Sequence, residues 1–220
     1  MSVSTFPNLA ESLDLPGSDS LEAVDWLRDL FAERVEPEPQ LTVSQWADQH
    51  RILPETAAEP GRWRTSRTPY LQEIMDALSA THPCEFVYFM KGSQIGGTEI
   101  GLNWIGYTIH HSPGLMLVVQ PTLQMVKRNT VTRIDPLIEA TPELKSRVVA
   151  VRSREGGNSM FRKAFPGGEL VMTGGNSAAG LRSTPARLLF LDEIDAYPLD
   201  ADGEGDPVDL AIRRTTTFRG

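Results

Sequence analysis

The sequence predicts an α/β protein built on a wound, mostly parallel sheet with flanking helices. Residues 115–120 and 187–191 are continuous apolar runs with the length of buried strands, and the second is expected to be a central parallel strand. The first run is followed by a helical pattern that continues through residue 134, and alternating strands and helices favour a parallel sheet. A third strand-type run, residues 85–90, leads through a glycine-rich loop into an apolar helical pattern over residues 98–109.

Two parts are expected along the chain. Residues 1–40 contain one amphipathic helical pattern around residues 21–31, followed by a segment at 35–40 in which prolines alternate with glutamates. Such a segment is typical of a linker, so the first helix is expected to lie apart from the core. Residues 41–220 are expected to form the main domain.

Shorter patterns supply the remaining elements of this domain. Helix starts with capping residues or an opening proline are predicted at residues 41–48, 69–78 and from 207 onward. Short strands are predicted at residues 148–151, 160–165 and 169–172. The last two are separated by Pro-Gly-Gly, which predicts a hairpin at an edge of the sheet.

The composition is that of an ordinary globular domain. The 220 residues are 40% hydrophobic and 23% charged, and Cys84 is the single cysteine, which excludes an internal disulfide and a cysteine-built zinc site. No apolar run is long enough to span a bilayer and no signal pattern opens the chain, so we expect a cytoplasmic protein without a membrane partner. The net charge of −8 does not forbid a local basic face, but the sequence alone shows no DNA groove.

The glycine-rich loop is a candidate phosphate-binding loop. Compared with the pattern G-x-x-x-x-G-K-[ST], Gly96 and Thr98 take the last glycine and the hydroxyl position, Gly97 stands at the lysine position, and Lys91 replaces the first glycine. Backbone N–H groups and the following helix N-terminus can still hold phosphates, and Lys91 can reach the terminal ones from the other end of the loop. An ordinary glycine-rich turn is the alternative. The residues expected to surround the phosphates are Lys91, Gly92, Ser93, Gln94, Ile95, Gly96, Gly97 and Thr98.

An acidic pair follows the apolar run at 187–191. Ligands of open α/β sheets bind beyond the carboxyl ends of the strands, where Asp192 and Glu193 stand. Asp192, together with Thr98, is expected to hold Mg²⁺, and Glu193 to orient and deprotonate the attacking water. The alternative is a strand that ends in a solvated acidic turn. The two motifs in this order predict an ATPase that uses ATP and Mg²⁺, with Lys91 and Glu193 as catalytic residues.

Several stretches in order resemble the ATPase part of large terminase subunits of lambda-like (GpA) phages. The stretches that carry the resemblance best are residues 91–98, 174–183 and 189–198, and it extends from about residue 41 to the C-terminus. The resemblance implies a P-loop NTPase-like, helicase-like fold. It also implies ATP hydrolysis that drives double-stranded viral DNA into procapsids, with a small terminase subunit, the portal and further copies of the full-length chain as partners. The N-terminal helix is a candidate docking site for the small subunit, and packing back on the chain's own core is the alternative.

The resemblance also implies roles for residues outside the two motifs. Tyr70 and Gln72 lie where helicase-like ATPases place adenine contacts; a core-packing tyrosine and a surface glutamine are the alternatives. Arg182 is a possible phosphate sensor, for its own nucleotide or for that of an adjacent subunit, and a salt-bridged structural arginine is the alternative.

The sequence departs from this family by stopping at Gly220, before the coupling motif and the nuclease domain. We therefore expect a fold that is incomplete at the C-terminus and no endonuclease activity. The threonines at 215–217 are expected at the end of a helix and in the turn after it. Two other interpretations remain open: another helicase-like ATPase, and a truncated prophage remnant that binds nucleotide weakly or is inactive.

Overall fold

The computed structural model describes most of the chain and divides it into two units, residues 1–40 and 41–220. The described residues are 25–26, 28–29, 39–92, 94–148 and 159–218. In the first unit, residues 25–26 and 28–29 are helical, and Arg28 forms an ion pair with Asp25 at 2.9 Å. Most of the helix predicted at 21–31 and of the predicted linker lies outside the described residues.

The second unit contains a four-stranded sheet whose order is β4-β5-β3-β6. Its strands are β3 (Leu115–Gln120), β4 (Arg162–Phe165), β5 (Gly168–Gly174) and β6 (Leu188–Leu191). Strands β5, β3 and β6 are parallel, and β4 pairs antiparallel with β5 as the predicted edge hairpin. The prediction of a mixed α/β fold with a mainly parallel sheet is therefore confirmed.

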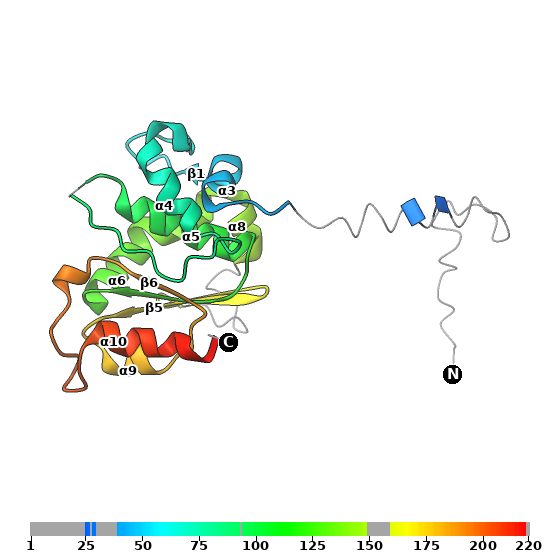
Figure 1. Ribbon diagram of the computed structural model, residues 1–220. Coiled ribbons are helices and arrows are strands. Elements are labelled where there is room, and N and C mark those ends of the chain that lie inside the picture. The colour runs from blue at the N-terminus through cyan, green and yellow to red at the C-terminus, as the bar shows by residue number, and fades with distance from the viewer. Residues whose placement is uncertain (1–24, 27, 30–38, 93, 149–158, 219–220) are drawn as a thin grey trace, which may run out of the picture. The chain divides into compact units, whose positions relative to one another are not determined.

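Helices cover both faces of this sheet (Figure 1). On one face, Met116 and Val118 of β3 join a core with α3 (Val43–His50), α4 (Gln72–Ala77), α5 (Gly97–His110), α6 (Leu123–Asn129), α7 (Asp135–Ala140) and α8 (Pro142–Arg147). On the other face, Leu117 and Val119 pack with α9 (Ala178–Arg182) and α10 (Pro207–Ile212). The alternation along β3 explains why this run is apolar throughout, since both of its faces are buried.

Short elements complete the unit. They are the antiparallel pair β1 (Ile52–Leu53) and β2 (Gly61–Arg62), and the 3₁₀ turns η1 (Thr65–Arg67), η2 (Pro69–Leu71), η4 (Ile194–Ala196) and η5 (Arg213–Phe218). Thr42 caps α3 with a capping box, as expected of the helix start at 41–48. The threonines at 215–217 lie in η5, at the end of the last helix as predicted.

The helix predicted to end at residue 134 continues to Ala140. Between α6 and α7, residues Thr130–Ile134 form a π-helical segment, η3. Pro136 explains the irregular turn, because a proline inside a helix has no N–H to donate and its ring crowds the carbonyl one turn earlier. Within this segment Thr130 and Ile134 are buried, whereas Arg133 is exposed.

The strand predicted at residues 85–90 is wrong. These residues have no regular secondary structure, and the side chains of Tyr88 and Met90 are 82% and 97% exposed. A strand needs a neighbour to accept its backbone hydrogen bonds, and β6, expected to be central, instead lies at an edge of the described sheet with half-buried side chains. No strand of the described residues pairs with the outer edge of β6.

Two further segments complete the comparison of the fold with the sequence. The strand predicted at 148–151 lies, apart from Val148, outside the described residues. The small-residue stretch at 174–183 contains a short helix, α9, capped by the Ser177 hydroxyl, which accepts from the Gly180 N–H. Within the described parts of the chain, no helix has the length and apolar character needed to cross a membrane.

Candidate nucleotide site

The predicted phosphate loop ends at an open helix N-terminus. Helix α5 has 14 residues and begins after Gly96, whose φ of 84° lies in the left-handed region that glycine adopts without strain. Gly96 has no side chain to cap the helix, so the N–H groups of Gly97 and Thr98 face the loop rather than an intrahelical acceptor. Such an N-terminus attracts anions through its free N–H groups and the helix dipole.

Lys91 lies across the start of this helix. A Cβ atom added to Gly97 would come within 2.3 Å of Lys91 Cδ, so the lysine stem fills the space that a side chain at position 97 would need. The displaced lysine thus passes over the position at which the usual pattern has one. Gly97 is required for this arrangement, because any larger residue would push the Lys91 stem away.

The segment before α4 contacts the same loop. The Tyr70 hydroxyl donates a hydrogen bond to the Ile95 carbonyl at 3.2 Å, and a Cβ on Gly96 would lie 3.1 Å from Leu71 Cδ1. Tyr70 is 57% exposed, so its ring is not part of the core and remains free to stack. Gln72 is exposed at the first position of α4. Ser93 is the one loop residue outside the described part.

The structure brings Asp192 toward Lys91. Asp192 follows β6, its N–H donates to the Val119 carbonyl at 3.0 Å, and its side chain is buried with 6% exposed. Burial raises the pKa of Asp192, while the positive charges of Lys91 and Arg133 lower it. The ammonium of Lys91 and the carboxylate of Asp192 are therefore within electrostatic reach of each other, although they are 101 positions apart in the sequence.

Tyr197 packs behind the acidic pair. Its hydroxyl donates to the Val119 carbonyl at 2.7 Å, and burial together with the charge of Asp192 raises the pKa of Tyr197. Tyr197 therefore stays neutral and fixes the end of β3 beside Asp192. A residue that anchors both strands at this point was not predicted from the sequence.

Glu193 differs from Asp192 in environment. It is exposed, and its φ of 55° places a non-glycine residue in the left-handed region. Strained backbone of this kind occurs at sites where a side chain must point in one direction. The alternative of a solvated acidic turn fits Glu193 and Asp195 by exposure, but not the buried Asp192.

A close contact between α5 and β6 sets the position of the loop relative to the acids. A Cβ on Gly101 would lie 2.1 Å from Phe190 Cε1, so the helix backbone rests directly on the Phe190 ring. Trp104 packs against the same ring edge to face, with 6.4 Å between centroids. Sequence reasoning missed Gly101, although a glycine inside an apolar helical pattern often signals such an approach.

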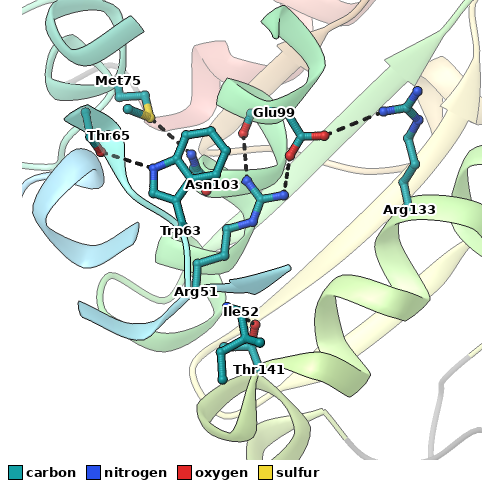
Figure 2. Close-up of polar contacts among 9 residues, drawn as sticks. All are labelled: Arg51, Ile52, Trp63, Thr65, Met75, Glu99, Asn103, Arg133 and Thr141. Carbon is teal, nitrogen blue, oxygen red and sulfur yellow. Dashed lines mark hydrogen bonds and ion pairs between the residues drawn. The ribbon is translucent and has the colours of Figure 1, made fainter. Parts of the chain in front are cut away.

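A second feature missed from the sequence is a polar network around Glu99 in the first turn of α5 (Figure 2). Arg51, 3% exposed, donates to the Glu99 carboxylate, to the Glu99 carbonyl at 3.3 Å, and to Asn103 Oδ1. Its guanidinium also lies 4.9 Å from the Trp63 ring centroid. On the other side, Arg133 Nη1 lies 3.7 Å from Glu99 Oε1. The network ties the start of α5 to two other parts of the fold.

Arg182 is placed away from these groups. Its guanidinium pairs with Glu204 Oε1 at 2.6 Å, on the sheet face covered by α9 and α10. That geometry matches the alternative of a salt-bridged structural arginine. The charges that lower the pKa of Asp192 come from Lys91 and Arg133.

Asp192 and Thr98 carry the kind of oxygen donors that Mg²⁺ uses. Among the described residues, no cluster of three or more histidine, cysteine or acidic side chains could hold a metal ion. Mg²⁺ usually needs only one or two carboxylates, with water and substrate phosphates as its other ligands. The buried carboxylate of Asp192 and the hydroxyl of Thr98 fit that donor set.

Comparisons with known proteins agree on one family. Residues 57–220 match the family model described as "Phage terminase large subunit gpA, ATPase domain". The chain is 30% identical over 190 residues to the "Terminase, large subunit" of Escherichia phage lambda, an alignment that covers 86% of this chain and 28% of that protein. No solved structure matches. The resemblance identified from the sequence is confirmed.

Proposed function

Since the chain belongs to the family of phage terminase large subunit ATPase domains, we propose that it hydrolyses ATP at the site formed by residues 91–98, Asp192 and Glu193. We further propose that the fold is of the P-loop NTPase type. The observation that carries the proposal is the convergence of Lys91 and Asp192, from motifs far apart in sequence, at the open N-terminus of α5. A helix N-terminus, a cation and a buried carboxylate are what a magnesium triphosphate requires.

Different groups of the chain have different roles in binding and hydrolysing ATP. The N–H groups at the start of α5 hold the phosphates, and Lys91 neutralises the charge that builds on the transferred phosphoryl group. Glu193, exposed and with its backbone in the left-handed region, orients the attacking water and accepts its proton. The Tyr70 hydroxyl is hydrogen-bonded to the Ile95 carbonyl of the loop, and its ring stacks on adenine. Gln72 contacts the same adenine.

Thr98 and Asp192 would hold Mg²⁺, which when bound neutralises the β- and γ-phosphate oxygens. Burial raises the pKa of Asp192, and the nearby charges of Lys91 and Arg133 oppose this effect. A buried, partly uncompensated carboxylate gains more from a cation than a solvated one does, because the cation supplies the missing counter-charge.

In the cell, the proposed role of ATP hydrolysis is to drive double-stranded viral DNA into procapsids, in the cytoplasm of the bacterial host. The proposed partners are DNA, a small terminase subunit, the portal and other copies of the chain. The chain spans 28% of the length of the lambda relative, so this role and these partners describe the assembled motor. We propose that Arg182 senses the phosphate of a nucleotide bound to an adjacent subunit. For this it would have to leave its ion pair with Glu204.

We also propose that the ATPase fold requires another strand beside β6. Two observations support this: the outer edge of β6 pairs with no described strand, and residues 85–90 expose apolar side chains although their sequence favours a strand. A strand at that edge would give residues 85–90 a neighbour and stiffen the phosphate loop from its N-terminal side.

The test is phosphate release by the purified chain, with and without Mg²⁺ and double-stranded DNA. We expect Mg²⁺-dependent turnover that Glu193→Gln lowers about 10²- to 10⁴-fold while ATP binding persists. Lys91→Ala should weaken ATP binding as well. Asp195→Asn is the matched control, because it removes an exposed carboxylate two residues away and should leave turnover unchanged.

Each outcome separates the interpretations. Equal turnover in the unmodified and Glu193→Gln chains would refute the assignment of the water-orienting carboxylate. ATP binding without turnover in every chain would favour the inactive remnant, and strand unwinding would favour a helicase. Failure to bind ATP at all would refute the proposed site.

A further inference from the structure

Glu99 shares its carboxylate between two arginines that are held very differently. It lies one residue after Thr98, in the first turn of α5, with Arg51 on one side and Arg133 on the other (Figure 2). Arg51 is 3% exposed and bonds the Glu99 side chain, the Glu99 carbonyl and Asn103. Arg51 is therefore fixed in place.

Arg133 is held loosely. Its side chain is 47% exposed, and the 3.7 Å separating its Nη1 from Glu99 Oε1 exceeds the range of a hydrogen bond. The long arginine side chain can leave this position with little loss, since an exposed ion pair of this geometry contributes little to stability. Glu99 would keep Arg51 as its partner, so no buried charge would be left without a counter-charge.

The backbone around Arg133 is irregular. Arg133 lies in the π-helical segment Thr130–Ile134, and single π turns in otherwise regular helices occur frequently at functional sites. The neighbouring Thr130 is fully buried, and its hydroxyl donates to the Val126 carbonyl at 2.8 Å. The turn is thus anchored on its inner side while Arg133 projects from its outer side.

Arg133 also acts on the acidic half of the site. Burial raises the pKa of Asp192, and the charge of Arg133 is one of those that lower it, together with that of Lys91. The charge of Arg133 therefore acts on Asp192 at the end of β6, while its guanidinium lies 3.7 Å from Glu99 at the start of α5. A triphosphate placed over the loop would occupy the same region.

Building on the proposed ATP site, we propose that Arg133 is a phosphate-contacting residue that exchanges Glu99 for the terminal phosphate of ATP bound to the same chain. A terminal phosphate carries more charge than one carboxylate and matches the two-pronged guanidinium, so the exchange is favourable. Glu99 holds Arg133 near the site while it contains no nucleotide. Because the contact is with the terminal phosphate, Arg133 distinguishes ATP from ADP.

The experiment measures the dissociation constants of ATP and ADP, each with Mg²⁺, by titration calorimetry on the full chain. In Arg133→Gln, ATP binding should weaken by about tenfold or more, the effect of losing a hydrogen bond between charged groups, while ADP binding stays within about twofold. Arg128→Gln is the matched control, because it removes the same charge from an exposed position on the preceding helix. The control should leave both constants unchanged.

A purely structural role for Arg133 would weaken ATP and ADP equally, and that result would overturn the inference. If Arg133→Gln does not fold, Arg133→Lys replaces it: the charge remains without the guanidinium fork, and an ATP-to-ADP ratio equal to that of the unmodified chain would overturn the inference too. Lys91→Ala separates the two proposals. If Lys91→Ala weakens ATP binding but Arg133→Gln does not, only the present inference fails; if the unmodified chain binds neither nucleotide, both fail.

Discussion

Gly101 offers a sharp test of how the loop and the acids are held together. An alanine there would place its methyl group 2.1 and 2.2 Å from two carbons of the Phe190 ring, where ordinary contacts are 3.4–4 Å. The ring cannot simply move aside, because Trp104 packs against it edge to face. Helix α5 must therefore move away from β6.

The expected cost follows from two opposing effects. Overpacking of this severity lowers the free energy of unfolding by about 3 kcal/mol, and replacing glycine by alanine inside a helix raises it by about 1 kcal/mol. The net loss of about 2 kcal/mol should lower the melting temperature by about 4–8 °C in a domain of this size. Because α5 carries Gly97 and Thr98 while β6 carries Asp192, ATP affinity should also fall.

Gly106→Ala provides the matched control on the same helix. A methyl group at Gly106 would lie 2.2 Å from Trp46 Cη2, so it overpacks α5 against α3 rather than against the sheet. Thermal unfolding by circular dichroism should show similar losses of stability for both variants, whereas titration calorimetry should show weakened ATP binding only for Gly101→Ala. Unchanged melting temperature and ATP affinity in Gly101→Ala, or equal losses of affinity in both variants, would refute the reasoning.

Two further predictions concern pH. Burial alone would raise the pKa of Glu143, but hydrogen bonds from its own backbone and from His50, with the charges of His50 and His110, lower it overall. The ionised Glu143 therefore stabilises the fold above the ordinary pKa of 4.5, and this stabilisation is lost as the pH falls through the lower folded-state pKa. Glu143→Gln should consequently flatten the acid side of the plot of melting temperature against pH. An unchanged plot would contradict this. Asp192 has the opposite sign, because burial raises its pKa and its ionisation costs stability above that pKa. Asp192→Asn should have a higher melting temperature than the unmodified chain at pH 7, and this difference should disappear below about pH 3.8. A lower melting temperature of the variant at pH 7 would contradict the idea that the buried charge of Asp192 destabilises the fold.

The parts of the fold that depend on local pattern were predictable. The run at 115–120 became β3 with the predicted bounds, because its alternate side chains fill two cores. The run at 85–90 has the same composition signal but forms no strand, since a strand also needs a neighbour, which no short window of sequence reveals. The edge position of β6 could not be predicted for the same reason, because the neighbours of a strand cannot be read from a short window of sequence.

In the predicted site, too, some features could be recognised from the sequence and others only from the folded structure. The loop and the acidic pair could be recognised from residue types and spacing, and the reason a lysine can stand at position 91 became visible only in its packing over Gly97. The contacts of Glu99 with Arg51 and Arg133 could not be predicted, because they join residues 48 and 34 positions apart through folding alone. Gly101 carried a signal, a glycine inside a helix, but its partner Phe190 did not.

The central claim is that Lys91 and Asp192 act on one magnesium triphosphate. A double-mutant cycle of Lys91→Met and Asp192→Asn tests it most directly, with the dissociation constant of ATP and Mg²⁺ measured for each chain and folding checked by circular dichroism. The account predicts non-additive losses, with a coupling energy of at least about 1 kcal/mol. Losses that add to within about 0.5 kcal/mol, or an Asp192→Asn chain that binds ATP and Mg²⁺ as tightly as the unmodified protein, would contradict it.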